Sequence, residues 1–188
     1  AFQRTPAPRQ TALKSITLTS QHVNFKQRKV HMDFEAWMQF FGTSQDDPNL
    51  KAALAAAGVK KVPKLDEEEM SVQLELKGQG LELIMTDEAI LKKIKNQDVG
   101  EGPLIMSGVL GKVGKRYGRD VYTGKLPLGL AADMSQDAVR KILGKPTTTD
   151  TEPDIDIWSG KKGKISVSYA IGCASITAIS VKLPYVEF

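Results

Sequence analysis

The sequence is poor in the residues on which most enzyme active sites depend. Its 188 residues include a single cysteine, Cys173, and two histidines, His22 and His31. Both histidines fall within the first 31 residues, so the rest of the chain has no imidazole that could act as a general base, activate a nucleophile or bind zinc. We therefore expect no catalytic residue, no metal and no cofactor, and we predict that the protein is not an enzyme.

Disulfides and long apolar runs are missing as well. A single cysteine cannot form an internal disulfide, which is typical of a reducing compartment, and we expect a cytoplasmic protein. Without a histidine to activate its thiol, Cys173 is interpreted as a small buried residue. No stretch approaches the roughly 20 apolar residues that a membrane-spanning helix needs, and residues 1–31 lack the continuous apolar core of a secretory signal. We expect no membrane span.

Acidic residues are absent from residues 1–31, which contain six of the 26 basic residues. Their proline, glutamine and threonine content predicts a basic leader or tail outside the folded body, either a targeting arm or a linker. The remainder carries all 22 acidic residues against the 20 basic ones that remain. Nucleic-acid binding would need a basic patch on the folded part, so nucleic acid is not an expected partner. Whether the basic segment Lys112–Arg119 contacts a ligand is left open.

Hydrophobic periodicity predicts an α+β fold. A predicted helix over 48–57, which starts with an Asp-Pro cap and stops at Gly58, is followed by strands near 70–76, 80–85 and 104–112. We set the first unit at residues 32–102 and the second at 103–188. Residues 103–188 repeat this order with a helix over 135–143, capped by Asp133 or Ser135, and strands near 154–158, 164–169 and 175–183. Each unit is therefore a short helix plus a three-stranded antiparallel meander. We expect two sheets with a shared core in one globular body, and the matching order suggests a pseudo-repeat.

Two acidic segments are the candidate partner-binding residues. The first precedes a predicted strand and the second leads into Trp158; together they comprise Asp66, Glu67, Glu68, Glu69, Asp150, Glu152, Asp154, Asp156 and Trp158. A contiguous run of acids splays its side chains apart, which disfavours metal or glycosidase chemistry but suits steering of a basic partner. Alternation in a strand puts Asp154 and Asp156 on one face and Ile155 and Ile157 on the other. Trp158 is either a core anchor or an interface hot spot.

Several segments together carry a family resemblance. The first is an opening helix with acidic and aromatic residues, followed by Asp46-Asp47-Pro48, and the second is the acidic run 66–69 before a hairpin. The third is the stretch Leu126-Pro127-Leu128-Gly129-Leu130, followed by Ser135, Val139, Leu143-Gly144-Lys145-Pro146 and Trp158. Over about residues 33–184 the chain resembles immunity proteins of bacterial polymorphic-toxin and type VI secretion systems. The resemblance implies a non-enzymatic module that neutralises a cognate protein toxin by covering its active site.

The second half of that pattern also resembles a different family. The segment Ser-x-x-x-Val-x-x-x-Leu-Gly-x-Pro is similar to BamE-type outer-membrane lipoproteins, which implies an envelope-associated structural or assembly scaffold as the alternative function. That family carries a lipid-modified cysteine at its mature N-terminus, whereas the cysteine here is Cys173. This departure favours the toxin-neutralising function over the envelope scaffold.

Overall fold

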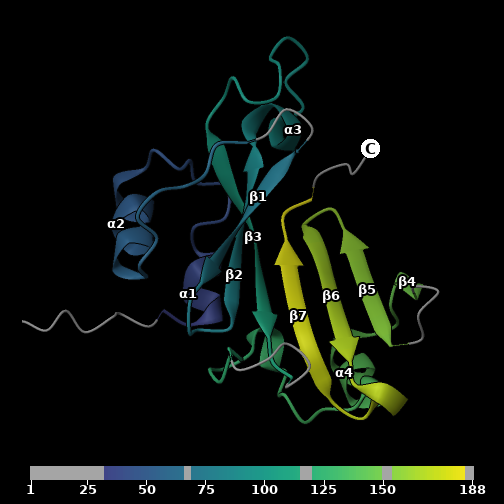
Figure 1. Cartoon of the computed structure of the whole chain (residues 1–188). Helices are drawn as coiled ribbons and strands as arrows, with labels where there is room; N and C mark the ends of the chain where they lie inside the picture. Colours follow the sequence, from purple (N-terminus) through teal and green to yellow (C-terminus); the bar gives the residue numbers. More distant parts are fainter. Residues whose placement is uncertain (1–31, 66–68, 115–119, 150–153, 185–188) are drawn as a thin grey trace, which may run out of the picture.

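The computed structural model of this chain describes residues 32–65, 69–114, 120–149 and 154–184, and Figure 1 shows their arrangement. The helices are α1 (Phe34–Met38), α2 (Pro48–Ala56), α3 (Glu88–Lys92) and α4 (Gln136–Leu143), with short 3-10 turns η2 (Pro127–Gly129) and η3 (Ile171–Cys173). The strands are β1 (Ser71–Leu76), β2 (Leu81–Asp87), β3 (Leu104–Lys112), β4 (Thr148–Thr149), β5 (Ile155–Gly160), β6 (Gly163–Tyr169) and β7 (Ile176–Lys182). The predicted α+β class is confirmed.

The seven described strands form one antiparallel sheet in the order β1-β2-β3-β7-β6-β5-β4. The expectation of two sheets is wrong, because β3 pairs with β7 from Gly108↔Lys182 to Lys112↔Ala178 and so joins the two meanders edge to edge. Pairing of these two strands satisfies backbone groups that would otherwise be exposed at two sheet edges. The proposed pseudo-repeat and the division into two units stay predictions.

Alternation along the strands gives the sheet two different faces. We call one the helix face; a row of paired residues across it consists of Leu74, Leu83, Val109, Val181 and Ile165. We call the other the open face; the neighbouring row across it consists of Glu75, Glu82, Leu110, Ser180, Ser166 and Ile157. The first row is apolar and the second mixed, as expected when only one side of a sheet is packed against helices.

Helices α1, α2 and α4 cover the helix face. Phe34 and Trp37 of α1, Leu50 of α2 and Val139 of α4 are fully buried and join the strand side chains in one continuous hydrophobic core. Figure 1 shows α1 and α2 beside the β1–β2–β3 half of the sheet and α4 beside the β5–β6–β7 half. Helices of five to nine residues are marginal in isolation, so burial of these side chains, worth about 1.5–3 kcal/mol each, is what holds them.

Side-chain caps fix where two of these helices begin. The Asp47 carboxylate accepts hydrogen bonds from the backbone N–H of Asn49 at 2.8 Å and of Leu50 at 3.0 Å. The Ser135 hydroxyl accepts one from the Ala138 N–H at 3.3 Å, so Ser135 rather than Asp133 caps α4. Each cap satisfies a donor that the first helical turn leaves unpaired.

The hairpin between β1 and β2 is tied to the segment that follows β3. Gly80 has φ +65°, and a β-carbon at this position would overlap the backbone of Tyr122. The Lys112 carbonyl accepts from the Tyr122 N–H at 2.6 Å, and the Tyr122 hydroxyl accepts from the Phe34 N–H at 3.0 Å. Tyr122 therefore connects this hairpin to the start of α1, and its position requires glycine at residue 80.

Candidate functional site

The middle of the open face is built from small side chains. Ser166 of β6 lies directly opposite Ser180 of β7, and in the next row Ser168 lies opposite Ala178. On the other side of β7, Gly108 of β3 is the partner of Lys182 and has no side chain of its own. Because cross-strand neighbours on one face contact each other, these positions form a low floor along β6 and β7.

Longer apolar side chains stand on both sides of this floor. Ile84 and Leu110 lie on β2 and β3, while Ile155 and Ile157 lie on β5. Between them is a hollow of about 250 Å³. Its lining residues all belong to strands: Gln73, Glu82, Ile84, Leu110, Ile155, Ile157, Lys164, Ser166, Ser168, Ser180 and Lys182. No residue of a described helix therefore lines it, and α3 sits beside the ends of β2 and β3.

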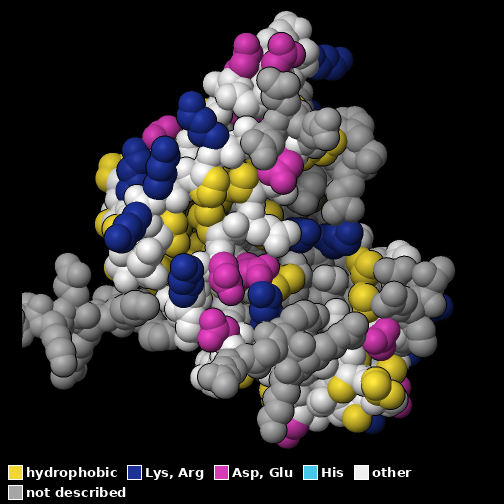
Figure 2. All heavy atoms as spheres, viewed as in Figure 1, with side chains coloured by type: hydrophobic (Ala, Val, Ile, Leu, Met, Phe, Trp, Pro, Cys, Tyr) yellow, Lys and Arg dark blue, Asp and Glu magenta, His cyan; other side chains and the backbone are white. Residues whose placement is uncertain are grey.

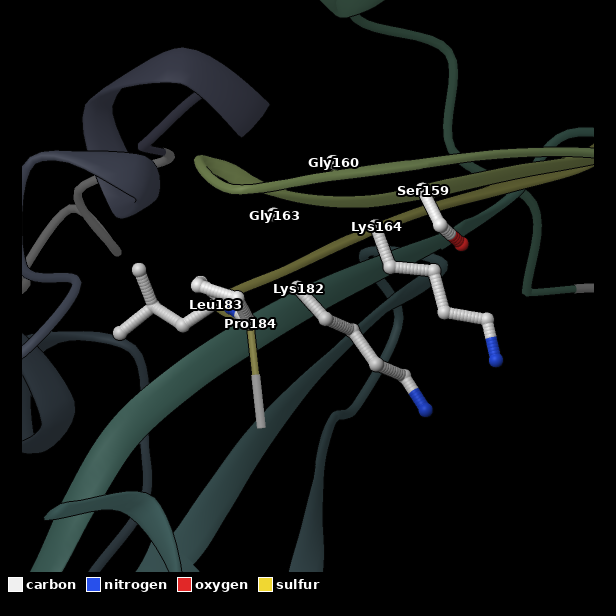
Figure 3. A pocket seen from close by; sticks show the side chains of 7 residues that line it. All are labelled: Ser159, Gly160, Gly163, Lys164, Lys182, Leu183 and Pro184. Atoms are coloured by element: carbon white, nitrogen blue, oxygen red, sulfur yellow. The ribbon is translucent and has the colours of Figure 1, made fainter. Parts of the chain in front are cut away.

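Charge on the open face is concentrated at two places. Lys164 and Lys182 are directly opposite each other on β6 and β7, and Figure 3 shows their side chains extending to the same side of the sheet. Across the floor, the Lys112 ammonium forms an ion pair with the Glu82 carboxylate. Lys164 and Lys182 thus carry like charge at adjacent positions, and Glu75 lies directly opposite Glu82 on the same face.

Ser180 is the most enclosed polar side chain of this hollow. The residue is 5% exposed, and its hydroxyl has no hydrogen-bond partner among the residues that the structure describes. A buried hydroxyl without a partner costs free energy relative to one hydrogen-bonded to water or protein. The site therefore offers an unused donor and acceptor beside two ammonium groups, within apolar walls.

The acidic residues predicted to bind a partner are distributed differently from this site. Asp66, Glu67, Glu68, Asp150 and Glu152 lie outside the described residues. Glu69 is exposed next to β1, and Asp154 is half-buried at the start of β5. None of these described acids lines the hollow on the open face. Their role in binding a partner remains a prediction.

Asp156 has an internal role. It is fully buried on the helix face, where the Arg140 guanidinium donates to its two carboxylate oxygens at 2.8 and 2.7 Å. The Tyr169 hydroxyl donates at 3.3 Å and the Gln136 amide at 3.4 Å. The sequence correctly predicted that Asp156 lies on the opposite face of β5 from Ile155 and Ile157. Asp156 faces the core, however, and the two isoleucines face outward, so the partner surface proposed below does not include Asp156.

This cluster shifts the titration of its neighbours. Burial, and then the negative charge of Asp156, raise the pKa of the Tyr169 hydroxyl well above its usual value. The hydrogen bonds from Arg140 to Asp156 raise the pKa of the guanidinium further, so it stays charged. Trp158, on the same face, donates from its indole N–H to the Gly144 carbonyl at 3.0 Å and packs against the core. These contacts join α4 to β5 and support the core-anchor interpretation of Trp158.

Two other sequence predictions can be compared with the structure. Cys173 is half-buried in η3 with a left-handed backbone, φ +57°, rather than fully buried in the core. In the basic segment 112–119, Lys112 is paired with Glu82 on the open face, and residues 115–119 lie outside the described part. Within the described ranges no group of three or more potential ligands could hold a metal ion, and no helix is long and apolar enough to cross a bilayer.

The open-face residues were not identified as a site from the sequence. The signal was present in β6, where Lys164, Ser166 and Ser168 alternate with Ile165 and Val167. That alternation shows that one side of β6 is polar and small, but not which strands lie next to it. No family model, curated protein or solved structure matches this chain.

Proposed function

We propose that this chain is a non-enzymatic protein-binding module and that the open face is its contact surface. The observation that carries the proposal is the hollow of about 250 Å³ on the open face, whose apolar walls have no helix over them among the described residues. Leu110, Ile155 and Ile157 are only half-buried there. Apolar side chains gathered around a recess are typical of surfaces that receive a partner's side chain.

A protein partner suits this surface better than a small ligand or a nucleic acid. The hollow lies below the roughly 300–1,000 Å³ of typical small-molecule pockets. Nucleic-acid surfaces carry a continuous basic track, whereas Figure 2 shows acidic, basic and hydrophobic side chains interspersed on the visible face. A partner loop that inserts apolar atoms into the recess and polar ones at its rim would match this mixture.

The resemblance to immunity proteins supports a more specific proposal. In that case the partner is a bacterial toxin, and the open face neutralises it by covering the cleft in which it acts. The module needs no reactive group for this function, which agrees with its lack of histidine after residue 31. Occlusion requires only a large complementary contact with a buried centre.

Affinity capture with matched variants tests the proposal. The full chain, Ile157→Asp on the open face and Ile142→Asp on α4 are each immobilised and exposed to lysate of the source organism. Both substitutions place the same charge on an outward-facing isoleucine; Ile142 is 47% exposed. We expect one protein to be retained by the wild type and by Ile142→Asp but lost by Ile157→Asp.

The captured protein then tests the more specific proposal. Expressed alone in a bacterial host it should arrest growth, and co-expression of the wild-type chain, but not of Ile157→Asp, should restore growth. Equal retention by the two variants would refute the open face as the contact surface. A captured protein that is harmless when expressed would refute toxin neutralisation while leaving protein binding intact.

A further inference from the structure

We propose that the outer edge of β1 pairs with the same edge of a second copy of this chain, so that two sheets continue as one across a two-fold axis. β1 is the first strand in the sheet order, and no described strand pairs with its outer side. Backbone groups left unpaired at a sheet edge are a template for another strand. This inference concerns assembly and does not depend on the proposed function.

The hydrogen bonds of β1 show which of its backbone groups point outward. The Met70 carbonyl accepts from the Asp87 N–H at 3.0 Å, and the register of β1 with β2 is unbroken from there on. In an antiparallel pair, alternate residues bond to the neighbouring strand. The backbone groups of Ser71, Gln73 and Glu75 therefore point away from β2. Within the described ranges, these outward groups have no hydrogen-bond partner.

The opposite edge of the sheet is protected, whereas the β1 edge is not. There β4 is two residues long, and the Thr147 hydroxyl accepts from the Ser159 N–H at 2.9 Å and donates to the Ile157 carbonyl at 3.0 Å. Very short edge strands and covered edge groups prevent pairing with another chain. β1 has six residues, and none of them is proline, glycine or lysine. Pairing with a further strand is therefore favoured at β1.

Charge selects one register for this pairing. Outward groups meet only in registers that differ by two residues. A two-fold axis at Gln73 places Glu69 opposite Lys77 of the other copy, and the symmetry repeats this pair. A shift of two residues one way would place Glu69 opposite Glu75, and a shift the other way would place Lys77 opposite Ser71. Opposite charges across strands stabilise a sheet and like charges destabilise it, so the axis at Gln73 is favoured.

The two charged residues are available for this contact. Glu69 and Lys77 are both exposed, and neither forms an ion pair with a described residue. They lie at the two ends of β1, so within one chain they do not compensate each other. In the same register Glu75 lies opposite Ser71 of the other copy, and no two like charges are directly opposite. The pairing therefore adds two ion pairs that the single chain lacks.

An exposed apolar side chain next to β1 gives separate support. Met70 is 39% exposed, although alternation with the buried Val72 and Leu74 places it on the helix face. With the axis at Gln73, Met70 lies opposite Leu76 of the other copy in a pair that is not hydrogen-bonded, the arrangement in which side chains approach most closely. A second copy would continue the helix face past Met70 and cover it.

The contact is short, so we expect a weak dimer. Stable interfaces bury about 1,200–2,000 Å², and two six-residue strands alone cover less. We expect a dissociation constant of about 1–100 µM. Sedimentation velocity of the full chain over this range of concentration should show one 20.6 kDa chain converting to two. A chain that stays monomeric throughout would overturn the proposal.

Charge reversals test the register. Glu69→Lys and Lys77→Glu each place like charges opposite each other, so either variant alone should dissociate roughly tenfold more readily or worse. An equimolar mixture of the two should regain the dimer, because every facing pair then joins an acid to a base. Lys141→Glu on α4, beside the other half of the sheet, is the matched control and should stay within about twofold of the wild type. Unchanged dissociation of the single variants, or a mixture that stays monomeric, would overturn the proposal.

An edge proline tests the backbone pairing itself. Proline has no N–H and is tolerated at a sheet edge where the N–H faces outward. Gln73→Pro should therefore fold but dissociate roughly tenfold more readily than Gln73→Thr, which also removes the amide side chain but keeps the N–H. Circular dichroism checks the fold. Equal dissociation of the two folded variants would overturn the proposal, and if Gln73→Pro does not fold, the charge reversals at the ends of β1 decide.

Failure of this inference can be distinguished from failure of the proposed function. Ile157→Asp lies on β5 and should leave the dimer intact while it abolishes capture of the partner. Lys77→Glu should weaken the dimer and leave capture intact. A dimer that Ile157→Asp dissociates and the charge reversals do not would place the contact on the open face and overturn pairing through β1.

Discussion

Replacing Asp156 by alanine should lower the free energy of unfolding by about 3 kcal/mol. The carboxylate is fully buried, and the substitution removes the hydrogen bonds that it accepts from Arg140 and Tyr169. Tyr169 is 1% exposed, so its hydroxyl would be left unpaired in the core, at about 1–3 kcal/mol. The bond to the guanidinium adds about 1 kcal/mol, discounted because the Arg140 side chain is 35% exposed and can be rehydrated.

Urea unfolding followed by tryptophan fluorescence measures this difference directly. A loss of about 3 kcal/mol corresponds to a melting temperature lower by about 6–12 °C for a chain of this size. Asp133→Ala is the control, because Asp133 is exposed and it should change stability by less than about 0.5 kcal/mol. Asp156→Asn should lose less than Asp156→Ala, since its amide oxygen still accepts a hydrogen bond. Equal stability of Asp156→Ala and Asp133→Ala would refute the conclusion that this cluster holds β5 against α4.

Two further predictions concern pH and packing. Because the pKa of Tyr169 is raised in the folded state, its contribution to stability is complete below about pH 10 and is lost as pH rises further. Tyrosinate absorbance at 295 nm should therefore show a step at high pH that Tyr169→Phe removes. An unchanged titration in that variant would contradict the prediction. Gly80→Ala should lower the free energy of unfolding by about 2 kcal/mol more than Gly78→Ala does, because both glycines have positive φ but only Gly80 lies against the Tyr122 backbone. Equal melting temperatures of the two variants would show that this contact is not tight.

Local structure was predictable from the sequence because short-range physics decides it. The cap at Asp47, the proline after it and the glycine at 58 define a helix without knowledge of any distant residue. The alternation of Val72, Leu74 and Leu76 with polar residues likewise defines a half-buried strand. Each of these features lies within a few residues of the element that it specifies.

The candidate site was not predictable, because it depends on which strands are neighbours. Ser166 and Ser180 are 14 positions apart, and Lys164 and Lys182 are 18 apart; only the β6–β7 register makes them adjacent. The walls depend on longer connections still, since Leu110 approaches Ser180 through the pairing of β3 with β7. The acidic candidates lie close together in the sequence, Asp66 to Glu69 in one run and Asp150 to Asp156 at alternate positions, whereas the hollow on the open face is assembled from separate strands.

The sequence by itself determined the helices and strands other than α3 and β4, the α+β class, the absence of histidine after residue 31 and the two-sided pattern of the strands. Only the tertiary structure decided that the two meanders form one sheet and that Asp156 faces inward while Ile155 and Ile157 face outward. The physical reason is that alternation divides a strand into two sides but does not choose between them. That choice was made by α4, whose Arg140 pairs with Asp156 and so fixes which side of β5 is covered.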